Sequence, residues 1–198
     1  MFKRKFLVVY NISFISILIM NLYAQSPSNE LVINEVLLDT VNQKNSWIEI
    51  FNSSDSEIIL KTLFTSYVKT PNLLPKEIKE QGGIIFKPKS YLIICWDLNE
   101  FKKNWQVPDE VKIIDNFRFY KKGGVIGIRG LNAMNKNLYD DIKFGLANKE
   151  IESESVGEMD INLYQFSLSR IPNAGDTNNC TEDFKISTPT PGRENIVK

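Results

Sequence analysis

Short apolar runs of strand length recur along most of this chain, and residues that favour turns separate them. The runs cover residues 31–38, 46–51, 57–60, 84–86, 91–96, 111–114, 125–129, 138–144 and 163–168. Turn signals at intervals of roughly 8–12 residues are typical of all-β sandwiches and barrels. Aromatic residues, which favour strands, make up 11% of the chain. The pattern therefore predicts an all-β fold, with residues 163–168 as its last clear strand.

Two of these runs indicate where the core lies. Residues 91–96 are apolar at every position, which predicts a central strand that is covered on both faces. In the second run, Trp47 and Glu49 fall on one face of a strand, whereas Ile48 and Ile50 fall on the other. Residues 97–105 are the exception to the strand pattern, and they predict one or two turns of helix.

The start of that helix has its own signal. Asp97 is a favourable N-cap residue, and Glu100 stands three residues later, as in a capping box.

The N-terminus has the features of an export signal. Lys3, Arg4 and Lys5 precede a mostly apolar stretch at residues 6–20, and Ala24 marks a plausible cleavage point. The apolar stretch is shorter than the ~20 residues that a spanning helix needs, so no membrane span is expected after cleavage. An uncleaved anchor and a cytosolic leader strand are the alternatives. We therefore expect a signal peptide at 1–24, a polar lead at 25–30, and one domain at 31–195 that is periplasmic, secreted or on the cell surface.

The net charge and the absence of histidine exclude several classes of enzyme, metal site and ligand. Removal of residues 1–24 leaves 21 basic and 24 acidic residues, a net charge of −3, so general attraction to phosphate backbones is not expected. The chain contains no histidine, which excludes Ser-His-Asp and Cys-His hydrolases and histidine-dependent nucleases and zinc sites. Carboxylates, Lys and Tyr remain as groups for catalysis.

The carboxylates offer two candidate sites, each with a simpler interpretation. Calcium binds six to eight oxygens, and the sequence offers Asp97, Glu100, residues 109–110, and Asp176 with residues 178–179. Their spacing matches no EF-hand loop, so solvated acidic loops are expected instead. Asp140 and its neighbour at 141 point to opposite faces of a strand, which favours a structural role over a catalytic pair.

The two cysteines are far apart in the sequence. Cys95 lies in an apolar strand and is expected to be a buried thiol, whereas Cys180 lies in a polar stretch that predicts a loop. Export makes a disulfide between them chemically possible.

Three polar positions have a structural interpretation. Glu49, inside an aliphatic strand, needs a partner if it is buried, and Arg170 just after the last strand is a candidate. Exposure of Glu49 to solvent is the alternative. Asn52 ends a strand and can bond the backbone two residues on, and Pro191 with Gly192 can end the final strand.

One aromatic cluster offers a binding surface. Phe117, Arg118, Phe119 and Tyr120 form a run in which an arginine stands among aromatic residues, and we expect Trp105 as its neighbour. Such a surface can stack on sugars, bases or a partner protein. Core packing explains the same residues more simply.

Segments at both ends of the domain resemble the lamin-tail domain family, in its exported bacterial form. The resemblance covers residues 31–195 and is carried by Ile33-Asn34-Glu35-Val36, Trp47-Ile48-Glu49-Ile50-Phe51-Asn52, Gly123 to Ile128, Asp140-Asp141-Ile142, Ser169-Arg170-Ile171-Pro172-Asn173, and Thr190-Pro191-Gly192 with Asn195. The chain departs from the family pattern at residues 60–64, which lack a Gly-Trp pair, and at 150–158, which look like an insertion.

The resemblance implies an immunoglobulin-like β-sandwich and no catalytic residues. It implies a structural role for the motif residues Asn34, Glu35, Trp47, Glu49, Asn52, Arg170, Pro172, Pro191 and Gly192. Such domains mediate protein and nucleic-acid contacts in nuclear lamins and accompany exported nucleases and other hydrolases in bacteria. We therefore expect a non-catalytic module, without cofactor or metal, that binds a protein, glycan or nucleic acid in trans. The alternatives are a carboxylate-dependent or metal-dependent hydrolase or nuclease, and a surface protein that assembles through sheet edges.

Overall fold

The computed structural model describes residues 30–39, 41–66, 82–115, 118, 123–132, 135–145 and 166–196. The expected signal peptide at 1–24 and residues 25–29 of the polar lead lie outside these residues. The elements are β1 (Leu31–Leu37), η1 (Gln43–Asn45), β2 (Trp47–Asn52), β3 (Ile58–Ser66), β4 (Ile84–Phe86), β5 (Tyr91–Cys95), α3 (Leu98–Asn104), β6 (Lys112–Ile114), β7 (Gly123–Asn132), β8 (Asn135–Gly145), β9 (Ser167–Arg170), α4 (Cys180–Asp183) and β10 (Phe184–Ser187).

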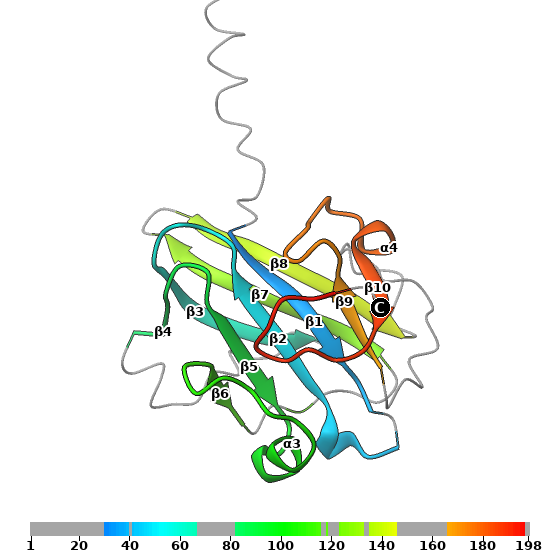
Figure 1. Cartoon of the computed structure of the whole chain (residues 1–198). Helices are drawn as coiled ribbons and strands as arrows, with labels where there is room; N and C mark the ends of the chain where they lie inside the picture. The colour runs from blue at the N-terminus through cyan, green and yellow to red at the C-terminus, as the bar shows by residue number, and fades with distance from the viewer. Residues whose placement is uncertain are drawn as a thin grey trace, which may run out of the picture.

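These strands form two sheets, which confirms an all-β fold. The larger sheet has six strands in the order β10-β9-β1-β2-β5-β6, and the smaller has four in the order β4-β3-β7-β8. Neighbouring strands are antiparallel except for β5 and β6, which run parallel. Figure 1 shows the long strands β7 and β8 lying behind β1 and β2. The first strand and the last two strands of the domain lie side by side in the larger sheet, since β1 pairs with β9 and β9 pairs with β10.

One hydrophobic cluster joins the two sheets. It takes Ile48 and Ile50 from β2, Leu60 from β3, and Ile126 and Ile128 from β7, all fully buried. The larger sheet also buries apolar residues on its other face, in a second cluster that α3 covers. The strand β5 contributes to both clusters, as its continuous apolar run predicts.

The end of the domain differs from its sequence-based expectation. The strand expected at 163–168 is β9, but it covers residues 167–170, and residues 163–165 lie outside the described part. A further strand, β10, and the short helix α4 follow it, although the turn residues there predict only loops. Turn residues lie on both sides of β10, but the four residues of this strand are enough to pair with β9.

The helix at 97–105 is confirmed as α3, with its predicted cap. The Asp97 carboxylate accepts the backbone N–H groups of Asn99 and Glu100, both at 3.0 Å. The N–H of Glu100 is the largest influence that lowers the pKa of this carboxyl. The Glu100 side chain bonds Asn42 and Asn104, so the reciprocal half of a capping box is not formed.

We expect the replacement Asp97→Ala to lower the free energy of unfolding, because two N–H groups at the start of α3 lose their acceptor. Asp97→Ser should retain most of the stability, since serine also caps well. Denaturant melts followed by tryptophan fluorescence measure both changes. Equal losses for Ala and Ser would show that the cap contributes nothing.

Candidate functional site

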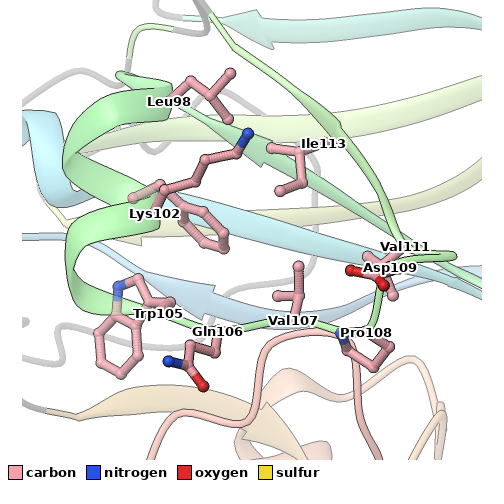
Figure 2. A pocket seen from close by; sticks show the side chains of 10 residues that line it. Leu98, Lys102, Trp105, Gln106, Val107, Pro108, Asp109, Val111 and Ile113 are labelled. Atoms are coloured by element: carbon pink, nitrogen blue, oxygen red, sulfur yellow. The ribbon is translucent and has the colours of Figure 1, made fainter.

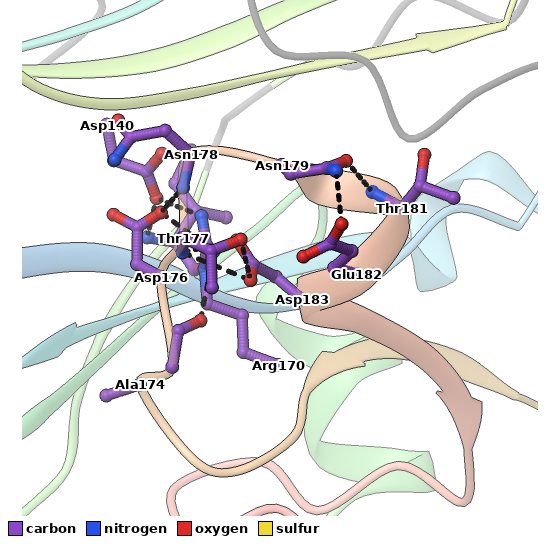
Figure 3. A network of polar contacts seen from close by, with 12 residues as sticks. Asp140, Arg170, Ala174, Asp176, Thr177, Asn178, Asn179, Thr181, Glu182 and Asp183 are labelled. Atoms are coloured by element: carbon purple, nitrogen blue, oxygen red, sulfur yellow. Dashed lines mark hydrogen bonds and ion pairs between the residues drawn. The ribbon is translucent and has the colours of Figure 1, made fainter.

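Arg170 of β9 is fully buried between the two sheets, where three carboxylates surround its guanidinium (Figure 3). Its Nη2 lies 2.9 Å from Oδ2 of Asp140, and its Nη1 lies 2.8 Å from Oδ2 of Asp183 and 3.2 Å from Oδ1 of Asp176. Asp140 belongs to β8 of the smaller sheet, whereas Asp183 ends α4. The guanidinium therefore links the two sheets and the C-terminal helix.

Backbone groups and an aromatic ring complete the environment of Arg170. Its Nε donates to the carbonyl of Ile33 at 2.8 Å, and its guanidinium carbon stands 4.6 Å from the centre of the Phe184 ring. Asp140 also accepts the N–H of Ile33, at 2.7 Å. Burial nevertheless raises the pKa of Asp140 to about 7, and Arg170 and the Ile33 N–H act against that rise. Asp140 therefore joins β8 of the smaller sheet to β1 and β9 of the larger sheet.

The predicted pair between Glu49 and Arg170 is wrong, and so is exposure of Glu49 to solvent. Glu49 is fully buried. Its Oε1 accepts a hydrogen bond from the Asn34 side chain at 2.7 Å, and its Oε2 accepts the N–H of Gly192 at 2.6 Å. Successive side chains of a strand point to opposite faces. Ser169 pairs with Glu35, which pairs with Glu49, so Arg170 falls on the other face of the sheet.

Glu35 and Glu49 form a buried pair of carboxyl groups on the outer face of the larger sheet. They stand opposite each other in the β1–β2 ladder, next to an irregularity in register between Ile33 and Glu35. Glu35 accepts hydrogen bonds from the hydroxyls of Ser167 and Ser169. Burial raises the pKa of both glutamates, and Glu35 raises that of Glu49 further; none of the interactions that shift either pKa comes from a cation.

These glutamates hold the end of the chain, residues 188–196, which we call the C-terminal strap. The N–H of Thr190 donates to Glu35 at 3.0 Å, while that of Gly192 donates to Glu49. The Asn195 side chain donates to the carbonyls of Asn34 at 3.0 Å and Arg170 at 3.2 Å. Figure 1 shows the strap, in red, crossing β1 and β2. Through these hydrogen bonds, the strap brings motif residues from the two ends of the sequence into contact with each other.

The remaining motif residues lie in turns, in the strap or in the core. Asn52 accepts the N–H of Ser54 at 3.0 Å, as predicted, and also donates to carbonyls that precede β5. Pro191 is buried in the strap, and the prediction that Pro191 and Gly192 end the final strand is wrong, because β10 ends at Ser187. Pro172 is exposed, and its carbonyl accepts the N–H of Gly175 at 2.8 Å. Trp47 is fully buried in β2, with one strand between it and Arg170.

We expect Gly192→Ala to destabilise the strap by about 1–3 kcal/mol. The backbone of Gly192 has φ +74°, and an added Cβ would stand 3.0 Å from Val111 and 3.1 Å from Pro108. Gly82→Ala is a matched control, because Gly82 has φ +87° with nothing within 4 Å of an added Cβ. The Gly192 variant should therefore lose more stability in denaturant melts than the Gly82 variant. Equal losses would contradict tight packing of the strap.

A surface hollow of about 680 Å³ lies between α3 and the segment that leads into β6 (Figure 2). Its lining includes an apolar group made of Leu98, Phe101, Trp105, Val107, Val111 and Ile113. Polar side chains lie among them: Lys102 comes from α3, Gln106 from the following segment, and Asp109 from the turn before β6. We call this feature the α3 hollow.

Trp105, one of the predicted binding residues, lines the α3 hollow and is half-buried. Its Nε1 donates to the Asn45 side chain at 3.3 Å, and its ring packs against Trp47 at 6.1 Å in an edge arrangement. These contacts fix the orientation of the indole ring. The buried Nε1 of Trp47 itself has no hydrogen-bond partner among the described residues.

The other predicted binding residues are only partly described. Arg118 is exposed. Phe117, Phe119 and Tyr120 lie outside the described residues, so their expected grouping with Trp105 stays a prediction.

The C-terminal strap supports one wall of the α3 hollow. Arg193 donates from its Nη1 to the carbonyl of Gln106 at 3.2 Å. The backbone of Gly192 lies close to the same wall, since a Cβ added there would stand 3.0 Å from Val111, 3.1 Å from Pro108 and 3.4 Å from Val107. The residues that resemble the family motif therefore also position the side chains that line the hollow.

The candidate calcium residues are engaged in other contacts, and the expected solvated loop is wrong for Asp176, whose side chain is 3% exposed. Asp97 caps α3, Asp176 contacts Arg170, and Asn179 caps α4. Asp109 is exposed, as a solvated loop requires. Among the described residues, no group of three or more acidic, cysteine or histidine side chains is arranged to hold a metal ion.

Cys95 and Cys180 are not joined by a disulfide in this structure. Cys95 is buried as predicted, and burial raises its pKa to about 12. The loop prediction for Cys180 is wrong, because it begins α4 and is buried in the core between the sheets. Cys95 belongs to the cluster on the opposite face of the larger sheet, so the sheet separates the two thiols.

Sequence reasoning missed Asp183, a buried partner of Arg170. Asp183 lies within a run of turn residues, where a carboxylate ordinarily indicates a solvated surface. No short-range pattern marks it as a partner of Arg170, because α4 places it there.

Comparisons of the chain with protein-family models, curated proteins and solved structures found no match. Within the described residues, none of the helices has the length and apolar character needed to cross a membrane.

Proposed function

We propose that this protein is an exported, non-catalytic binding module of the lamin-tail type, with an immunoglobulin-like β-sandwich fold. In this proposal, it docks a partner protein in trans through the α3 hollow, in the periplasm or at the cell surface. Two sheets around a shared core support the fold. The meeting of the two terminal motifs beneath the C-terminal strap supports the resemblance.

The observation that carries the binding proposal is the setting of Trp105 in the α3 hollow. A half-buried tryptophan of fixed orientation, next to apolar side chains and with polar groups nearby, resembles the anchors of protein interfaces. The buried carboxylates, by contrast, bind groups of the fold itself. Glu35 and Glu49 hold the strap, and Asp140 holds Arg170. The hollow has one carboxylate, Asp109, which gives little support to a carboxylate-dependent hydrolase or nuclease.

Site-specific photocrosslinking tests the docking proposal. A benzophenone amino acid replaces Lys102 at the hollow, or Lys185 on β10 as an exposed control, in the full chain expressed with its own leader. We expect one specific adduct from position 102 that the further replacement Trp105→Ala abolishes. Equal adducts from both positions, or an adduct that survives the loss of Trp105, would contradict docking through the α3 hollow.

Export is tested separately, by mass spectrometry of the protein recovered from the envelope or the medium. We expect its N-terminus at Gln25. Recovery of the intact chain from the cytosol alone would contradict the proposed location.

Assembly through sheet edges remains a second candidate, because one observation favours it. The outermost strand β4 carries no charged residue, and its Ile85 is 64% exposed beside Ile59, which is 45% exposed. An exposed apolar edge is a template for pairing with another strand. If the protein assembles this way, sedimentation should show association that rises with concentration and that Ile85→Lys abolishes. A monomer at all concentrations would exclude this candidate.

A further inference from the structure

We propose that the α3 hollow binds an extended peptide segment of the partner through one inserted apolar side chain. A basic residue on one side of that anchor would face Asp109, and an acidic residue on the other side would face Lys102. This inference rests on the proposed function and specifies its ligand.

The apolar part of the hollow suits an aliphatic or aromatic anchor. Phe101 of α3 and Trp105 just after it line one side of the hollow. Val107 and Val111 line the opposite wall (Figure 2). Its volume of about 680 Å³ exceeds that of one side chain, so adjoining peptide backbone can also enter. A Leu-sized side chain that is fully buried there stabilises the complex more than an alanine methyl group does.

Two charged side chains of the hollow, Lys102 and Asp109, determine the direction in which the peptide segment binds. Figure 2 shows Lys102 on the α3 side of the hollow and Asp109 on the side of β6. Both side chains are exposed, and neither makes an ion pair with another described residue. Opposite charges on two sides favour a ligand that carries the complementary charges in one order. Such surface pairs select the orientation more than they add affinity.

The same features disfavour the other two ligand classes. A phosphate backbone would meet Lys102 but would be repelled by Asp109, and the mature chain is net negative. A glycan needs several hydrogen-bonding side chains around an aromatic platform. Here Trp105 already donates its N–H to Asn45, and seven of the ten lining residues have apolar side chains.

The wall opposite α3 is already in place without a ligand. The N–H of Val111 donates to the carbonyl of Pro108 at 3.0 Å, and Arg193 of the strap holds the carbonyl of Gln106. A hollow whose wall is held before binding loses less conformational freedom when a ligand enters.

NMR titration of the ¹⁵N-labelled full chain tests this inference. The probes are acetyl-Lys-Gly-Leu-Gly-Glu-amide, its Leu→Ala analogue, and the same peptide with Lys and Glu exchanged. We expect the Trp105 indole signal to shift, the Leu peptide to bind about tenfold more tightly than the Ala peptide, and one charge order to bind better. In the double variant Lys102→Asp with Asp109→Lys, the preferred order should reverse. Both positions are exposed, so the variant should keep the wild-type spectrum elsewhere.

Equal binding of the Leu and Ala peptides, or the same preferred order in the charge-swapped variant, would overturn the inference. Stronger shifts at Trp105 with a thymidine oligonucleotide or a maltose oligosaccharide would overturn it in favour of those ligand classes. The crosslink at position 102 separates this result from the proposed function. A specific adduct without peptide binding contradicts only the peptide ligand, whereas loss of the adduct contradicts docking itself.

Discussion

Replacement of Arg170 by methionine should destabilise the protein by about 3–5 kcal/mol. Methionine has a similar length, so the loss comes mainly from charge rather than volume. The guanidinium contacts Asp140, Asp176 and Asp183, and all three carboxylates are nearly inaccessible to solvent. Without Arg170, they would remain buried next to one another with no cation to compensate them. Since small domains have total stabilities of about 5–15 kcal/mol, much of the protein should unfold under mild denaturation.

A double variant distinguishes two causes of the lost stability: buried carboxylates without a compensating cation, and lost packing contacts. Asp140→Asn removes one of the carboxylates that Arg170 compensates, and it should restore part of the stability when it is combined with Arg170→Met. Urea melts followed by tryptophan fluorescence measure all three variants. If the two effects simply add, the loss in Arg170→Met does not come from its pairing with Asp140. Arg170→Lys should fall between wild type and Arg170→Met, because lysine keeps the charge but cannot reach as many acceptors.

The free energy of unfolding should be greater at pH 5 than at pH 8, with a difference of about 2–3 kcal/mol from Asp140 alone. Burial raises the pKa of Asp140 from 3.8 to about 7 in the folded state. The folded protein therefore retains a proton that the unfolded chain loses near pH 4. This contribution to stability is complete below the unfolded pKa and is lost as the pH rises through about 7. The raised pKa values of Glu35 and Glu49 act in the same direction.

Asp97 has a lowered pKa, so it acts in the opposite direction, but only at more acidic pH. Between pH 5 and 8 it is ionised in both states and does not contribute to the difference. Asp140→Asn and Glu49→Gln should each flatten the dependence of the unfolding free energy on pH. Stability that stays constant or increases from pH 5 to 8 would show that the buried carboxyls ionise as readily in the folded protein as in the unfolded chain.

The elements most visible in the sequence are those whose pattern is local. The segment 91–96 is apolar throughout, and it forms β5, a strand covered on both faces. Asp97 stands before a helix whose first free N–H groups it accepts, which requires only neighbouring residues. Neither prediction needed knowledge of distant contacts, because hydrophobic alternation and helix capping act over a few positions.

The hydrogen-bond partner of Glu49 could not be predicted from such local patterns. Its burial and its need for a partner follow from its place in an aliphatic strand, yet the choice of partner depended on the face of the sheet. Arg170 lies one position from Ser169, and this single position directs it between the sheets instead of toward Glu49. The α3 hollow is a similar case. Trp105 could be singled out as an aromatic residue, but the wall of residues 107–111 is held by the strap from the end of the chain.

Local patterns in the sequence were enough to predict the all-β character of this protein and the position of α3. Hydrophobic periodicity and helix capping depend on neighbouring residues, so both can be read from the order of residues in the chain. The fold as a whole sets which carboxylates surround Arg170, which side chains hold the C-terminal strap, and that a hollow forms beside Trp105. Strap contacts such as the one between Gly192 and Glu49 join residues more than a hundred positions apart in the chain. Their geometry depends on the pairing of every strand between them.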